Sequence, residues 1–145
     1  MENKEIAGEA ILSARRWLES SQATAKDGNY DVAIYGLEMS VEIALKAVML
    51  SIGVETPKIH AIGDAFAKVV KENGRVPLEF SSSLTETIGT FNKLLELRSV
   101  AGYMFESGDE FANFEKQYNA LEGSACRVVA MCEKAVRSIS GKGRG

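Results

Sequence analysis

The stretch GNYDVAIYGLEMSVEIALKAVMLSIG, residues 28–53, decides the fold of this 145-residue chain. Its apolar side chains recur every three or four positions, which places them on one side of an α-helix. The apolar stripe and its margins comprise Ile34, Leu37, Val41, Leu45, Val48 and Ile52, with Ala33, Ile43, Ala47 and Leu50. Only a narrow polar ridge of Glu38, Glu42 and Lys46 remains. A helix this apolar is expected to be the most buried one of its domain, with Gly53 ending it.

The same periodicity predicts four more helices. They are expected over about residues 4–26, 57–73, 83–106 and 111–139. The first carries Trp17 on its apolar side, so this side chain is expected in the core. The second begins behind Thr56 as N-cap, and the third begins at a capping box of Ser83 and Glu86. After a break at residues 107–109, the last helix has an apolar seam of nearly four heptads, which indicates packing along a helix of the same chain or of a twin subunit.

These elements predict an all-α protein, an up-and-down four-helix bundle with one additional short helix. No segment shows the alternation of a β-strand, and short loops between long helices make neighbours antiparallel. Residues 1–140 are expected to form a single domain, because the chain has the size of one domain and enough apolar surface for one core. Residues 141–145 are expected to be a short, basic, disordered tail.

Composition limits where the chain acts and what it binds. The formal net charge of −3 comes from 20 acidic and 17 basic side chains scattered along the chain, so no basic stripe predicts non-specific binding to a phosphate backbone. Cys126 and Cys132 lie six residues apart in one predicted helix, about 9 Å along its axis and on different faces, so they cannot pair. Without a leader or an apolar run of roughly 20 residues, a cytoplasmic protein that does not enter the membrane is expected.

Residue types and spacing exclude several kinds of catalytic site. The di-metal site of a helical bundle needs two Glu-x-x-His pairs, whereas His60 is the single histidine and no acid stands three residues before it. Two cysteines on different faces and a distant histidine do not make a zinc ligand set. The glycine spacing of a P-loop is absent, and Ser83 is better explained as a helix cap than as a nucleophile. Neither a metal nor a cofactor is therefore expected.

Two segments together match the pattern of a known family. They are GNYDVAIYGLEMSVEIALKAVMLSIGVETPKIHAIGDAF, residues 28–66, and LLELRSVAGY, residues 94–103. The matching positions are Gly28, Tyr30, Ala33, Leu45, Lys46, Ala47, Leu50, Gly53, Pro57, His60, Ile62 and Arg98. Over about residues 10–105 the chain resembles the HEPN superfamily of small prokaryotic and archaeal helical-bundle proteins.

This resemblance implies a homodimer that binds nucleotide or RNA and that is often encoded with a small nucleotidyltransferase, its possible partner protein, as in toxin–antitoxin pairs. Many members are metal-independent ribonucleases whose active motif is an arginine, four to six residues and a histidine, sometimes with a tyrosine two positions beyond. Here Arg98 matches the arginine, but Tyr103 stands in place of the histidine and Phe105 in place of the tyrosine. A subgroup with an arginine and a tyrosine at this spacing is also similar.

The tyrosine changes the expected chemistry. Cleaving RNA through its 2′-hydroxyl needs a group that exchanges a proton near neutral pH, which imidazole does and a phenol with a pKa of about 10 ordinarily does not. The expected function is therefore binding of nucleotide or RNA without robust nuclease activity, through Arg98, Tyr103 and Lys46. The candidates for any residual catalysis are Arg98, Tyr103 and His60, because antiparallel helices bring His60 to the Tyr103 end of the bundle.

Arg98 and Tyr103 also fit roles that involve no nucleotide. An ion pair with Glu38, Glu42 or Glu96 would account for Arg98, and packing in the core would account for Tyr103. The chain is alternatively a toxin-like endoribonuclease that uses Arg98 and a displaced histidine. A third alternative is a helical scaffold that holds a nucleotidyltransferase through the seam of the last helix.

Overall fold

The computed structural model describes residues 3–101 and 111–142, which contain five helices and no strand. The helices are α1 (Asn3–Lys26), α2 (Tyr30–Ser51), α3 (Gly63–Glu72), α4 (Leu78–Ala101) and α6 (Phe111–Lys142). The all-α prediction is confirmed. Helix α6 includes the first two residues of the segment expected to be a tail, and the break predicted at residues 107–109 lies outside the described residues.

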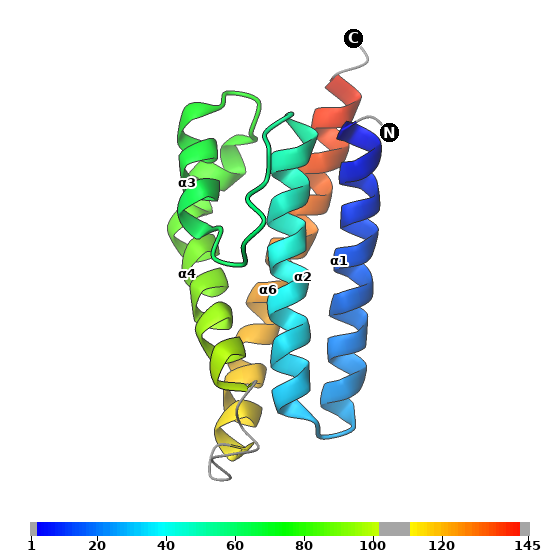
Figure 1. Ribbon diagram of the computed structural model, residues 1–145, viewed down its shortest axis with the longest axis vertical. Helices are drawn as coiled ribbons and strands as arrows, with labels where there is room; N and C mark the ends of the chain where they lie inside the picture. The colour runs from blue at the N-terminus through cyan, green and yellow to red at the C-terminus, as the bar shows by residue number, and fades with distance from the viewer. Residues whose placement is uncertain (1–2, 102–110, 143–145) are drawn as a thin grey trace.

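Helix α2 is the central element. Figure 1 shows α1, α2, α4 and α6 running along the long axis of the molecule, with the short α3 beside α4. Helix α2 contacts each of the other four described helices, and its predicted stripe from Ile34 to Val48 is fully buried. The prediction that this is the most buried helix is confirmed. It ends where predicted, because Gly53 takes a φ of +79° that favours glycine.

The apolar seam of α6 packs within the chain. The residues Phe114, Tyr118, Ala125, Val128, Cys132, Ala135 and Ile139 are all buried. Helix α6 lies against α2 and α1, so the described part of the predicted seam is a contact between helices of one chain. Within this core, both thiols are free, and Cys132 is fully buried.

Two predicted helix starts are wrong. Helix α3 begins at Gly63, so Thr56 does not cap a helix and residues 54–62 are not helical. This segment folds back along α2, where two of its residues bind polar side chains of the ridge. Helix α4 begins at Leu78, directly behind Pro77, whose carbonyl accepts a 3.0 Å hydrogen bond from the amide of Phe80. Ser83 therefore lies inside the helix and donates to the carbonyl of Glu79 instead of capping it.

The buried face of α1 is rotated relative to the face predicted from the sequence. Its buried residues are Ala7, Ile11, Ala14, Leu18, Ser21 and Ala25. Trp17, expected in the core, is 36% exposed, because the neighbouring Leu18 takes the buried position against α2. Small residues fix this rotation, since Ser21 lies against Gly36 of α2 and donates a 2.6 Å hydrogen bond to the carbonyl of Ala33.

The close approach of α1 and α2 makes Gly36 a sensitive position. A Cβ atom at this position would lie 2.9 Å from the Cβ of Ser21, closer than packed carbon atoms approach. We expect Gly36→Ala to lower the free energy of unfolding by about 1–3 kcal/mol, in spite of a helix propensity gain of about 1 kcal/mol. Urea denaturation followed by circular dichroism measures this.

Gly89→Ala in α4 is the matched control, because a Cβ atom there meets nothing within 4 Å. This control is expected to stabilise the protein by about 0.5–1 kcal/mol. Equal stabilisation by both substitutions would show that the two helices do not meet at Gly36.

Candidate functional site

Arg98 of α4 reaches across to the polar ridge of α2. Its Nη1 donates a 2.9 Å hydrogen bond to Oε2 of Glu38 and lies 3.6 Å from Oε1 of Glu42. Its Nη2 donates a 2.6 Å hydrogen bond to the hydroxyl of Tyr35, and the guanidinium carbon lies 4.2 Å from the centre of the tyrosine ring. The arginine side chain is only 12% exposed, so these contacts hold it in place.

Two carboxyl groups lie buried beneath this guanidinium. Glu38 is fully buried, and Glu42 is nearly so. Burial and the adjacent Glu42 carboxylate raise the pKa of Glu38 from its ordinary 4.5 to about 8, although Arg98 acts in the opposite direction. Burial opposes the charge of Glu42 as well, but hydrogen bonds with Glu38, His60 and Lys46 outweigh it and lower the pKa of Glu42. At neutral pH the pair therefore holds one proton, on Glu38.

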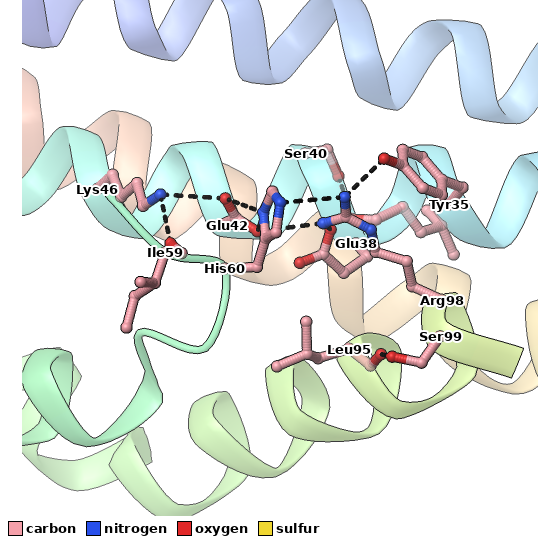
Figure 2. A network of polar contacts seen from close by, with 11 residues as sticks. Tyr35, Glu38, Ser40, Glu42, Lys46, Ile59, His60, Leu95, Arg98 and Ser99 are labelled. Carbon is pink, nitrogen blue, oxygen red and sulfur yellow. Dashed lines mark hydrogen bonds and ion pairs between the residues drawn. The ribbon is translucent and has the colours of Figure 1, made fainter. Parts of the chain in front are cut away.

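Glu42 also binds two side chains on its other side (Figure 2). Lys46 donates a 3.1 Å hydrogen bond to Oε2 of Glu42 and a 2.8 Å hydrogen bond to the carbonyl of Ile59. His60 Nδ1 lies 3.0 Å from Oε1 of Glu42, and its Nε2 lies 3.3 Å from Nη2 of Arg98. These contacts fasten the segment before α3 to α2. We call the set Tyr35, Glu38, Glu42, Lys46, His60 and Arg98 the Arg98 cluster.

The contacts of His60 determine which of its nitrogens carries the proton. A carboxylate only accepts hydrogen bonds and a guanidinium only donates them. The proton therefore belongs on Nδ1, facing Glu42, and Nε2 is an acceptor beside Arg98. Because the side chain is 55% exposed, this acceptor lies at the surface. With Glu38 protonated, the two fixed cations Arg98 and Lys46 exceed the single charge of Glu42, and the cluster is cationic.

The structure brings together three of the residues singled out in the sequence: Arg98, His60 and Lys46. Tyr103 lies outside the described residues. Arg98 lies within salt-bridge distance of Glu38 and Glu42, as the ion-pair interpretation expected, and Glu96 makes no such contact in the described part of the chain. Tyr35 was missed, although it stands three residues before Glu38 and so on the same side of the helix, a spacing that would have indicated it.

Comparison with protein families identifies the chain. The family model described as HEPN domain matches residues 7–135. The chain belongs to the HEPN domain family. No curated protein and no solved structure gives a match. The HEPN match covers every residue of the Arg98 cluster.

Neither a metal-ligand cluster nor a membrane-spanning helix is found in the described part of the HEPN chain. Across residues 3–101 and 111–142, no group of three or more His, Cys, Asp or Glu side chains is placed to hold a metal ion. No helix within these two ranges is both long enough and apolar enough to span a bilayer.

The raised pKa of Glu38 makes the stability of the protein depend on pH. The folded chain keeps a proton that the unfolded chain loses between pH 4.5 and 8, so this stabilising contribution is complete below pH 4.5 and is lost as the pH rises through about 8. We expect the free energy of unfolding to fall over this range by up to about 5 kcal/mol, at about 1.4 kcal/mol for each unit of the pKa shift. Glu38→Gln should largely remove the decline, because its amide replaces the protonated acid.

The measurement is urea denaturation at several pH values. Glu133→Gln is the control, since Glu133 pairs with Arg15 away from the cluster. Repeating both measurements in a His60→Gln background removes the imidazole beside Glu42 from the comparison. The same decline in Glu38→Gln as in the unmodified protein would contradict a proton held on Glu38.

Proposed function

We propose that this HEPN domain binds the phosphate of a nucleotide or of RNA at the Arg98 cluster, as a homodimer and without robust nuclease activity. The single observation that carries the proposal is the meeting of Arg98, His60 and Lys46 on a cationic cluster whose outer edge is exposed. We further infer that the four long helices form the expected up-and-down bundle, with α3 as the additional short helix. A cytoplasmic location is part of the proposal and is supported by the two free thiols.

The anchoring of Arg98 supports phosphate binding. A phosphate needs donors held in a fixed orientation, and Glu38 and Tyr35 hold this guanidinium while leaving part of it at the surface. Lys46 supplies a second positive charge nearby, beyond Glu42 along α2 (Figure 2). We retain Tyr103 as a proposed further contact, five residues after Arg98.

The count of proton carriers favours binding over cleavage. Metal-independent cleavage needs one group to take the proton of the 2′-hydroxyl and another to protonate the leaving oxygen. The chain has one histidine, and lysine and arginine have ordinary pKa values of about 10 and above, which do not suit them to this role. A second imidazole would have to come from another copy of the chain.

A second candidate function is RNA cleavage by His60. The observation that favours it is the acceptor Nε2 of His60, 3.3 Å from Arg98, with Nδ1 held by the Glu42 carboxylate. A carboxylate behind an imidazole and a guanidinium beside it are suited to taking a proton next to a bound phosphate.

A nucleotidyltransferase remains a proposed partner protein. Most described residues of the α6 seam are buried inside the chain and Leu121 is half-buried against the same core, so such a partner would dock on another surface.

Nucleotide binding can be measured by calorimetric titration with AMP and with a 5′-phosphorylated oligoribonucleotide at low salt. We expect Arg98→Lys to weaken binding roughly tenfold, because lysine keeps the charge above Glu38 but loses the planar donor fork. Arg15→Lys is the matched control, an arginine paired with Glu133 at a distance from the cluster, and should leave affinity unchanged. Absence of heat and of a melting-temperature shift with either ligand would reject the proposal.

Nuclease activity is tested with end-labelled RNA in the presence of EDTA. We expect no cleavage above background, because one imidazole does not supply both proton transfers. Cleavage that disappears in His60→Ala and in Arg98→Lys, but persists in Arg15→Lys, would replace the binding proposal with the second candidate.

A further inference from the structure

A pocket of about 260 Å³ opens beside the Arg98 cluster, between α1, α2 and the end of α4. Its lining is largely apolar and includes Trp17 and Thr24 of α1, Val32 and Tyr35 of α2, and Ala101 of α4. Trp17, Val32 and Tyr35 are three of the large apolar side chains that the described residues leave exposed. Two aromatic side chains, each about one-third exposed, therefore line one hollow.

The pocket and the cluster share a wall. Tyr35 lines the pocket and accepts a hydrogen bond from Nη2 of Arg98, and the guanidinium of Arg98 lies over its ring. Ala101 lies three residues after Arg98, on the same side of α4, about 4.5 Å along the helix axis. Figure 2 shows Tyr35 on one side of Arg98, and His60 and Lys46 on the other. An apolar aromatic subsite and a cationic subsite are therefore adjacent.

We propose that this pocket receives the nucleobase of a nucleotide whose phosphate lies on Arg98. The inference rests on the phosphate-binding function proposed above and names the part of the ligand that the second subsite takes. Trp17 lines the pocket and is partly exposed, so a planar aromatic base can stack on it, and base–aromatic stacking contributes on the order of 1–3 kcal/mol per base. The negative phosphate complements Arg98, while the uncharged base complements the apolar pocket.

The test uses the fluorescence of Trp17, which is the single tryptophan of the chain. We expect AMP to quench this emission and ribose 5-phosphate to leave it unchanged, while ribose 5-phosphate competes with AMP for Arg98. In calorimetric titrations, Trp17→Leu should weaken AMP binding roughly tenfold or more and leave ribose 5-phosphate binding unchanged. Leu12→Ala is the matched control, because Leu12 is an exposed apolar residue of α1 outside this pocket.

The outcomes separate this inference from the function on which it rests. Equal affinity for AMP and ribose 5-phosphate, unaffected by Trp17→Leu but weakened by Arg98→Lys, overturns the base pocket and leaves phosphate binding intact. Failure of both compounds to bind overturns both proposals. Trp17 emission that shifts with protein concentration and is not quenched by any nucleotide indicates a second copy of the chain on this surface, which also overturns the base pocket.

Discussion

Two carboxyl groups buried one helical turn apart on α2 are the constraint on which the rest of the structure depends. Glu38 and Glu42 cannot both be charged in this position unless cations from other elements compensate for lost hydration. Three features compensate for the burial of these carboxyl groups: Arg98 from α4, Lys46 from α2 itself, and a proton kept on Glu38. These contacts fix part of the fold, because Arg98 ties α4 to α2 and Lys46 and His60 tie the segment before α3 to the same helix.

The same contacts make this region chemically distinctive. On its buried side the guanidinium of Arg98 contacts Glu38 and Glu42, which hold it in one orientation. Its remaining surface faces the partly exposed imidazole of His60. Breaking the buried pair by removing one partner leaves an uncompensated charge, which is more costly than the pair itself. The contacts with Glu38 and Glu42 that explain the position of Arg98 are thus compatible with the anion binding proposed for it, because they hold the guanidinium in one orientation.

Sequence patterns predicted the helices more accurately than their faces and starts. The periodicity of α2 and α6 was decisive because α2 leaves only a narrow polar ridge and α6 has one regular seam; the prediction that α2 is the most buried helix is confirmed, and the seam packs along helices of the same chain. Helix α1 has apolar residues on two sides, so periodicity did not distinguish Trp17 from Leu18 as the buried one. The predicted starts of α3 and α4 were wrong, because Thr56 and Ser83 are residue types that often cap helices but do not do so here. Contacts of residues 59 and 60 with α2 delay the start of α3, and Pro77 sets the start of α4.

The sequence by itself determined an all-α chain, its central helix, the end of that helix at Gly53 and membership of the HEPN family, and it singled out Lys46, His60 and Arg98. It placed these three residues on separate segments. Only the tertiary structure decided that they meet, that Tyr35 joins them, and that Trp17 faces a pocket instead of the core. The physical reason is that periodicity is a local property of one helix, whereas the pairing of buried charges depends on how several helices are rotated against one another.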